Sequence, residues 1–138
     1  APIGQRGLYT SRQGLDVADY LEVANDETLL IILIEDIAAV QNLDEILAVD
    51  HIDVFFVAPT DLAQSMGHVA NTAHPKVQDT ITDAISRINA AGRVAGFTTS
   101  NDQIADYVGR GARVFLTSVG GWLAAGAKDF MNRAEAAL

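Results

Sequence analysis

Two acidic residues stand just after apolar stretches that have the composition of buried strands. Glu35 follows the apolar run at residues 29–34, and Asp61 follows residues 54–57 and Pro59. In parallel α/β folds, ligands bind at the carboxyl ends of the strands, and neighbouring strands lie roughly 4.8 Å apart. Two carboxylates at adjacent strand ends can therefore meet one cation, and oxygen donors suit an octahedral Mg²⁺ or Mn²⁺ site. An acid after a strand is also often the N-cap of the next turn, so position alone leaves both interpretations open.

The three histidines and the tryptophan give weaker signals. His51 lies in a helix-to-strand connection, on the side of the sheet away from the ligand end, and we interpret it as structural. His68 follows a glycine in a loop on the ligand side, where a solvated histidine is favoured over a pocket residue. His74 precedes Pro75 and is expected at the start of a helix. Trp122 follows two glycines after the last predicted strand, where it could close a pocket, pack at a subunit contact or join the core.

Alternating strands and helices must position these residues. Strands are predicted at residues 29–34, 54–57, 94–98 and 114–117, and helices at residues 16–24, 37–47, 75–91, 100–108 and 122–137. The first strand has six consecutive apolar residues, which is typical of a strand buried on both faces. Residues 1–14 are expected to form a looped lead-in, and a loop is expected after residue 57. Ser100 and Gln103 have the spacing of a capping box.

Four repeats of strand and helix predict a parallel sheet with right-handed crossovers. Two architectures fit this pattern, an open doubly wound sheet and part of a (β/α)₈ barrel. A whole barrel needs roughly 250 residues, and this chain of 138 residues supplies four of the eight units. If the fold is a barrel, this chain would therefore form half of it.

Composition sets the broad class of protein. The chain is 49% hydrophobic and 20% charged, which is ordinary for a globular domain. Its net charge of −9 argues against nucleic-acid binding, because a phosphate backbone needs a basic surface. It has no cysteine and no apolar run long enough to suggest a membrane span. The first residues, APIGQRG, lack the apolar core of a secretory signal, so a cytoplasmic location is expected.

Several short motifs together resemble one family. They are Ile34-Glu35, Ala39, Asn42-Leu43 and Ile46; then Pro59, Asp61-Leu62 and Met66-Gly67; then His74-Pro75 and Val77; and PIGQRG near the start. In this order and spacing the sequence resembles, nearly end to end, the HpcH/HpaI family of class II aldolases. That family includes 4-hydroxy-2-oxo-heptanedioate aldolase and 2-keto-3-deoxy-sugar-acid aldolases.

The resemblance implies a fold, a site and a reaction. Residues 1–138 would be a single domain, the C-terminal half of a (β/α)₈ barrel. Glu35 and Asp61 would hold a divalent metal, Mg²⁺ or Mn²⁺ with Co²⁺ possible, and pyruvate would chelate it through its carboxylate and keto oxygens. Backbone N–H groups around Thr60 and Asp61 would bind the pyruvate carboxylate. As a Lewis acid, the metal would stabilise the pyruvate enolate in reversible cleavage of a 4-hydroxy-2-oxo acid to pyruvate and an aldehyde. Members are commonly hexamers that exchange the last helix between partners.

The sequence departs from the family pattern at informative places. Leu33 replaces a glutamine, Ala58 replaces a glycine, and the segment Ser118-Val119-Gly120-Gly121 lacks the family's acid. The family's catalytic His and substrate-binding Arg lie on strands earlier than any in this chain. The chain is therefore part of a longer or processed polypeptide, is completed by a second polypeptide, or is a half-barrel that has lost catalysis. The alternative functions are an acyl-CoA lyase of the same superfamily and a non-catalytic binding or assembly module.

Overall fold

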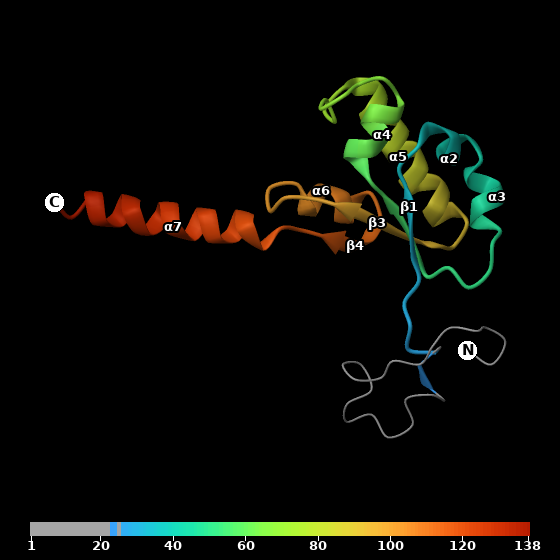
Figure 1. Ribbon diagram of the computed structural model, residues 1–138, viewed down its shortest axis with the longest axis horizontal. Helices are drawn as coiled ribbons and strands as arrows, with labels where there is room; N and C mark the ends of the chain where they lie inside the picture. Colours follow the sequence, from blue (N-terminus) through green and yellow to red (C-terminus); the bar gives the residue numbers. More distant parts are fainter. Residues whose placement is uncertain (1–22, 25) are drawn as a thin grey trace, which may run out of the picture. The chain divides into compact units, whose positions relative to one another are not determined.

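The computed structural model describes residues 23, 24 and 26–138. The chain divides into two compact units, Ala1–Leu30 and Ile31–Leu138, and the second contains the sheet and its helices (Figure 1). The expected lead-in at residues 1–14 lies outside the described residues. So does the expected helix at residues 16–24, apart from residues 23 and 24. The assignment of residues 1–138 to a single domain stays a prediction.

Strands and helices alternate through the second unit. The strands are β1 (Ile31–Ile34), β2 (Val54–Val57), β3 (Val94–Thr98) and β4 (Ala112–Leu116). The helices are α2 (Ile37–Gln41), α3 (Leu43–Leu47), α4 (Pro59–Ser65), α5 (Pro75–Ala90), α6 (Ile104–Gly109) and α7 (Val119–Glu135). No helix in the described part of the chain is long and apolar enough to cross a membrane.

The order of the strands distinguishes between the two architectures that the sequence allowed. The sheet has the order β1-β2-β3-β4, and every neighbouring pair is parallel. In a doubly wound sheet the strand order reverses at a switch point, which places helices on both faces. A sequential order with crossovers of one hand keeps the helices on one face, as in a barrel. The prediction of a partial (β/α)₈ barrel is confirmed.

The helices cover one face of the sheet, and the core lies between them. Alternate residues along the strands point into this core. They pack against α5, whose buried residues recur at helical spacing. They are Ile34, Phe55, Val57, Ala95 and Phe97 from the strands, with Val77, Ile81, Ala84, Ile85 and Ile88 from α5. The predicted helix at residues 75–91 is thus confirmed, and it ends before Gly92, which has a φ of +70°.

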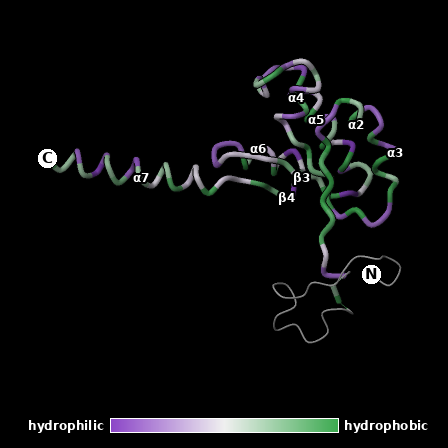
Figure 2. Tube along the Cα trace, in the orientation of Figure 1, coloured by the Kyte–Doolittle hydropathy of each residue, from purple (hydrophilic) through white to green (hydrophobic). Residues whose placement is uncertain are grey.

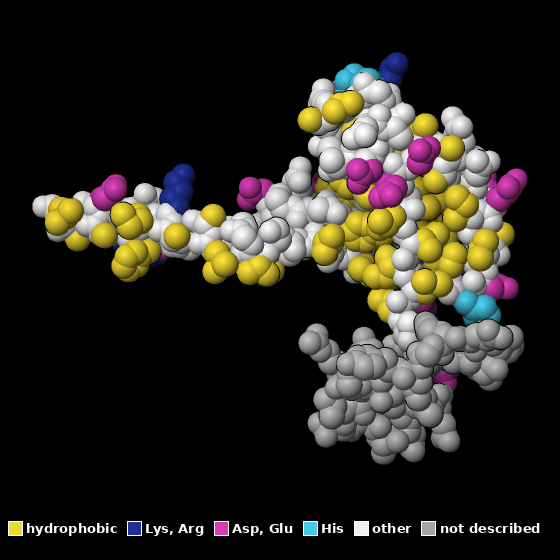
Figure 3. Space-filling view, viewed as in Figure 1, with side chains coloured by type: hydrophobic (Ala, Val, Ile, Leu, Met, Phe, Trp, Pro, Cys, Tyr) yellow, Lys and Arg dark blue, Asp and Glu magenta, His cyan; other side chains and the backbone are white. Residues whose placement is uncertain are grey.

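The opposite face of the sheet is only partly covered in the described part of the chain. Ile31 and Leu33 on β1 are 41% and 54% exposed. Figure 3 shows apolar side chains gathered around β1, and Figure 2 shows how apolar the strands are. The expectation that this strand is buried on both faces is wrong here, because β1 is an edge strand and the described helices pack on one side only.

Phe56 and Gly96 pack together on this same face. Leu33, Phe56 and Gly96 are register partners in three adjacent strands. A Cβ added to Gly96 would lie 2.5 Å from Cδ2 of Phe56, so the ring occupies the space that a side chain would need. The absence of a side chain at Gly96 therefore allows the Phe56 ring to pack closely against β3.

Local effects change two of the predicted helices and one predicted loop. The helix expected at residues 37–47 is divided at Asn42, whose Nδ2 donates to the carbonyl of Ala38 at 2.8 Å. Residues 59–65 of the loop expected after residue 57 form helix α4, because Pro59 begins a helix readily, and the loop is confined to residues 66–74. Ser100 and Gln103 form no capping box: their side-chain oxygens lie 3.3 Å apart, and α6 begins only at Ile104.

The last strand and helix begin earlier than the sequence predicts. β4 covers residues 112–116, and α7 begins at Val119 because Ser118 caps it, with its Oγ accepting from the Gly120 N–H at 3.2 Å. None of the 17 residues of α7 is buried. Five large apolar side chains on this helix are more than half exposed, namely Val119, Trp122, Leu123, Phe130 and Met131.

Candidate functional site

Glu35 lies at the carboxyl end of β1, beside the end of β2. Ile34 pairs with Val57 in the parallel register, and the Ala58 N–H donates to the Ile34 carbonyl at 3.1 Å. Side chains along a strand alternate between its faces. Continued from Leu33, this alternation places Glu35 on the face without described helices, where it is half-buried. A carboxylate therefore stands where the interior of a barrel would open.

Asp61 lies in the first turn of α4, immediately beyond β2. The N-cap of α4 is Ala58, so the alternative interpretation of Asp61 as a capping residue is wrong. Asp36, next to Glu35, is the residue that caps α2, because its Oδ1 accepts a hydrogen bond from the Ala38 N–H at 2.7 Å. Neither Glu35 nor Asp61 caps a helix, although both stand at the carboxyl edge of the sheet.

These two carboxylates match the donor chemistry of a hard divalent cation. Mg²⁺ in proteins commonly takes one or two carboxylates and completes its shell with water and substrate oxygens. No group of three or more His, Cys, Asp or Glu side chains that could hold a metal occurs among the described residues. The described residues therefore contain no site with three or more protein ligands of the kind that binds zinc. The two carboxylates agree with a site whose remaining ligands are oxygen atoms of water and substrate.

The first turn of α4 has backbone donors that no side chain caps. Ala58, the N-cap residue, makes no side-chain cap hydrogen bond, and Pro59 contributes no N–H. The first N–H groups of a helix have no partner within the helix. Thr60 and Asp61 therefore hold amides available to a small anionic group.

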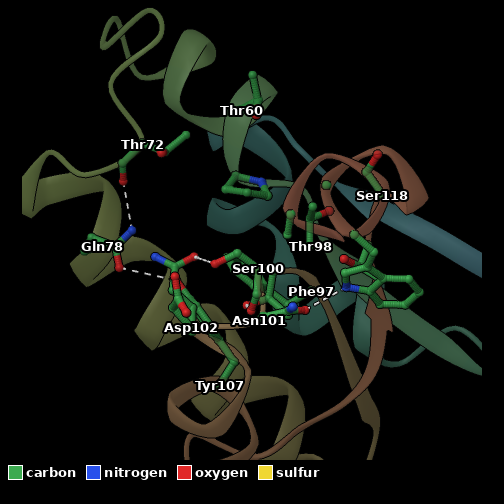
Figure 4. Close-up of a pocket in the computed structure, with 17 residues that line it drawn as sticks. Thr60, Thr72, Gln78, Phe97, Thr98, Ser100, Asn101, Asp102, Tyr107 and Ser118 are labelled. Atoms are coloured by element: carbon green, nitrogen blue, oxygen red, sulfur yellow. Dashed lines mark hydrogen bonds between the residues drawn. The ribbon is translucent and has the colours of Figure 1, made fainter. Parts of the chain in front are cut away.

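A pocket of about 630 Å³ lies at the carboxyl ends of β2, β3 and β4 (Figure 4). It is lined by Pro59, Thr60, Thr72, Gln78, Phe97, Thr98, Thr99, Ser100, Asn101, Asp102, Gln103, Tyr107, Thr117, Ser118, Gly121, Trp122 and Ala125. Its size is that of a typical small-molecule site. The residues come from segments that follow three strands and from the first turns of α7, so the fold alone brings them together.

Hydrogen bonds and ring stacking fix the aromatic part of this pocket. The Trp122 Nε1–H donates to Asn101 Oδ1 at 2.8 Å. The Tyr107 hydroxyl lies 3.4 Å from Gln78 Oε1, while Gln78 Nε2 donates to the Thr72 carbonyl at 2.8 Å (Figure 4). Burial raises the pKa of Tyr107, against the opposing charge of Arg110. The tyrosine therefore stays protonated at neutral pH and can act as a hydrogen-bond donor.

The structure brings some of the predicted residues to the pocket and leaves others beside it. Thr60 and Trp122 line it, whereas Glu35 and Asp61 do not. Of the three roles considered for Trp122, namely closing a pocket, packing at a subunit contact and joining the core, the first agrees with the structure. The polar segment at residues 98–103 was missed as part of a site. Its signal was the run of hydroxyl and amide residues directly after a strand, at the end of the sheet where ligands bind.

None of the three histidines is among the described residues that line the pocket. His68 stacks on His74 with ring centroids 3.7 Å apart. Burial lowers the pKa of His68, and the nearby positive charges of His74 and Lys76 lower it further. His74 caps α5 as expected, with its Nδ1 accepting from the Lys76 N–H at 3.2 Å. His51 lies in the turn before β2 with a φ of 62°.

Comparisons with known proteins agree with this arrangement. A hydroxypyruvate/pyruvate aldolase from Roseovarius nubinhibens is 45% identical over 105 residues, which cover 73% of this chain and 41% of that protein. A 2-keto-3-deoxy-L-rhamnonate aldolase from Klebsiella pneumoniae is 43% identical over 110 residues, covering 76% of this chain and 41% of that protein. The chain thus spans about two fifths of the length of these relatives.

Solved structures and a family pattern extend the likeness to most of the chain. An HpcH/HpaI aldolase/citrate lyase family protein from Burkholderia cenocepacia superposes with a TM-score of 0.82 at 26% identity, over 96% of this chain and 53% of that one. Macrophomate synthase shares the fold, with a TM-score of 0.75 at 22% identity over 99% of this chain and 51% of that one. The sequence matches the HpcH/HpaI aldolase/citrate lyase pattern over residues 2–125. The chain belongs to the HpcH/HpaI aldolase/citrate lyase family.

Proposed function

We propose that this chain carries the metal- and pyruvate-binding half of an aldolase. The reaction is the reversible cleavage of a 4-hydroxy-2-oxo acid to pyruvate and an aldehyde. One observation carries the proposal: Glu35 and Asp61 stand at the carboxyl ends of two hydrogen-bonded neighbouring strands, with neither used as a helix cap. Relatives at 41–45% identity are named as aldolases of oxo acids, which supports this reaction class.

Glu35 and Asp61 are the proposed metal ligands, and Mg²⁺ or Mn²⁺ is the proposed metal, with Co²⁺ as a substitute. When bound, the cation supplies Lewis-acid stabilisation of the negative charge that develops on the oxo acid. The amides of Thr60 and Asp61, at the uncapped start of α4, bind the pyruvate carboxylate. Leu33 supplies no hydrogen bond where the family has a glutamine, so substrate orientation depends more heavily on these amides.

The general base is proposed to come from residues outside this chain. The family resemblance implies that the catalytic His and the substrate Arg lie on earlier strands, and the chain spans about two fifths of the length of its relatives (41% for the Roseovarius protein). His68 is turned to His74 rather than lining the pocket. The three histidines of this chain are therefore given no catalytic role.

Assembly into a homo-oligomer, a hexamer in the family, is part of the proposal. Helix α7 has no buried residue, and apolar side chains follow one side of it in Figure 3. Burying such side chains is favourable by about 25 cal/mol per Å² of apolar surface. A partner that covers α7 would supply this burial.

Two other functions compete with the aldolase. An acyl-CoA lyase needs cations for its phosphates, but no Lys or Arg lines the described pocket. A non-catalytic binding or assembly module agrees with the partly uncovered sheet face and the exposed α7. Measuring the chemistry of bound pyruvate decides between this module and the aldolase.

The test combines metal content with proton exchange. We expect elemental analysis to find about one equivalent of Mn²⁺ on the chain, and Glu35→Gln or Asp61→Asn to abolish its retention. Glu45→Gln and Asp79→Asn remove carboxylates from the exposed helical layer and serve as matched controls. Exchange of the pyruvate methyl protons with D₂O is followed by NMR. A positioned base typically contributes about 10² to 10⁴-fold, so this chain should exchange at least ~10²-fold more slowly than a protein that contains the whole barrel.

The possible results separate the candidates. Unchanged metal content in the Glu35 and Asp61 variants would remove the metal assignment. Absence of exchange even in the whole-barrel protein would overturn the aldolase and favour the binding module. Equal exchange by the isolated chain would show that the base lies within it, and His68 would then be the first residue to replace.

A further inference from the structure

The walls of the pocket at the ends of β2, β3 and β4 are neutral and rich in hydroxyl and amide groups. Eleven of its side chains carry such groups, namely Thr60, Thr72, Gln78, Thr98, Thr99, Ser100, Asn101, Gln103, Tyr107, Thr117 and Ser118. Asp102 is the one charged side chain among the 17 described residues that line it. No Lys, Arg or His is among these lining residues. The pocket offers many hydrogen bonds and no positive side-chain charge.

This charge pattern disfavours an anionic guest. A phosphate or carboxylate that leaves water must be paired with a cation or with several donors, and an unpaired buried charge is costly. In this pocket it would also face the negative charge of Asp102 (Figure 4). Hydroxyl groups of a guest, by contrast, can both donate to and accept from Thr, Ser, Asn and Gln side chains.

The floor of the pocket suits the carbon chain of the same guest. Phe97 and Tyr107 stack with centroids 3.9 Å apart, and both are almost fully buried. Trp122 adds a third ring, held by its hydrogen bond to Asn101. Thr99, the buried polar residue beside them, is 8% exposed, and its hydroxyl makes only a long hydrogen bond of 3.3 Å to the Ser100 carbonyl. Aromatic faces contact C–H groups, while the surrounding hydroxyls satisfy the O–H groups.

We propose that this pocket binds the aldehyde partner of the aldol reaction, and that this aldehyde is uncharged and polyhydroxylated. The assignment of the guest as the aldehyde rests on the proposed function. Thr60 connects the two parts of the site, because it lines the pocket and belongs to the first turn of α4. The carboxylate end of the oxo acid would lie at α4, and the hydroxylated end would extend toward β3 and β4.

Trp122 is the single tryptophan of the chain, so its fluorescence reports on the pocket without requiring metal or turnover. We expect a saturable change in fluorescence when the 138-residue chain is titrated with erythritol, which cannot form imines with lysines. With pyruvate present to occupy the amides of α4, erythronate and glycerol 3-phosphate should bind at least tenfold more weakly. Equal or tighter binding of the two anions, or saturation by none of the three, would overturn the inference.

Variants test which groups set this preference. Thr99→Val keeps the shape but removes a hydroxyl, and should weaken erythritol binding by about 2- to 10-fold, whereas Thr99→Ser should restore it. Asp102→Lys should raise the affinity for glycerol 3-phosphate at least tenfold. Glu135→Lys makes the same charge change at the far end of α7 and should leave this affinity unchanged. Equal effects of the two lysine variants would overturn the role of Asp102.

Exchange of the pyruvate methyl protons with D₂O tests the proposed function independently of this inference. Exchange without a preference for erythritol would overturn the neutral pocket and leave the aldolase standing. A preference for erythritol without proton exchange in the whole-barrel protein would contradict the proposed aldolase function. The pocket would then remain a site for neutral polyols. Circular dichroism of each variant shows whether a lost signal reflects lost folding.

Discussion

Replacing Gly96 with alanine tests how the partly uncovered face of the sheet is packed. A Cβ at this position lies 2.5 Å from Phe56 Cδ2 and 3.0 Å from Val54 Cγ1. Carbon atoms in contact usually stand about 3.5–4.0 Å apart. The Phe56 ring must therefore move by roughly 1 Å, although it belongs to β2, whose four residues are all buried.

The magnitude follows from two opposing effects on the free energy of unfolding. Adding a methyl group to a well-packed region typically costs about 1–3 kcal/mol. Replacing glycine also restricts the unfolded chain, which stabilises the folded state by about 0.4–1 kcal/mol. The expected net loss is about 1–2 kcal/mol. For a domain near this size, the melting temperature should fall by roughly 4–12 °C.

Urea and thermal unfolding followed by circular dichroism measure this loss. Gly126→Ala is the matched control, because nothing lies within 4 Å of a Cβ there and the position is inside α7. It should be neutral or stabilise the protein by up to ~1 kcal/mol. A second variant that combines Gly96→Ala with Phe56→Leu should recover part of the loss. A Gly96→Ala protein as stable as the wild type would refute tight packing between β2 and β3.

Three further predictions concern backbone strain, pH and assembly. Ala70 has a φ of 56°, which glycine adopts more easily, so Ala70→Gly should raise the free energy of unfolding by up to ~1 kcal/mol in urea titrations, and a decrease would contradict this. The pKa of His68 is lowered in the folded state, so the unfolded chain binds more protons and stability should fall as the pH drops through about 6.5. Melting curves of His68→Asn between pH 7.5 and 5.5 should show a weaker fall, and an unchanged slope would remove His68 as the cause. Leu123→Glu with Phe130→Glu should shift the sedimentation coefficient from oligomer to smaller species, whereas an unchanged coefficient would exclude α7 from the interface.

The sequence by itself determined the elements whose signals are local. Residues 54–57 and 94–98 are strands as predicted, because their apolar runs are bounded by turn residues. Helix α5 has the predicted face and start, since a 3.6-residue period and a proline at its first position are properties of the segment itself. The start of α5 at His74 was also readable, because a cap bonds residues only two or three positions away.

The site was predictable only in part, for the same reason. Glu35 and Asp61 could be placed at strand ends from the order of the segments, whereas Asp61 could equally have been a cap until α4 was seen to begin at Pro59. The pocket wall at residues 98–103 and its closure by Trp122 depend on a contact with Asn101, 21 positions away, which no periodicity reports.

Only the tertiary structure decided which strands are neighbours and which face the helices cover. The order β1-β2-β3-β4 distinguishes a barrel from a doubly wound sheet, and both architectures share the same alternation along the chain. The apolar residues of β1 predicted burial on both faces, yet Leu33 is 54% exposed. An apolar side chain indicates that its burial is favourable in free energy. It does not indicate which surface will cover that side chain, because the covering residues are distant in the sequence.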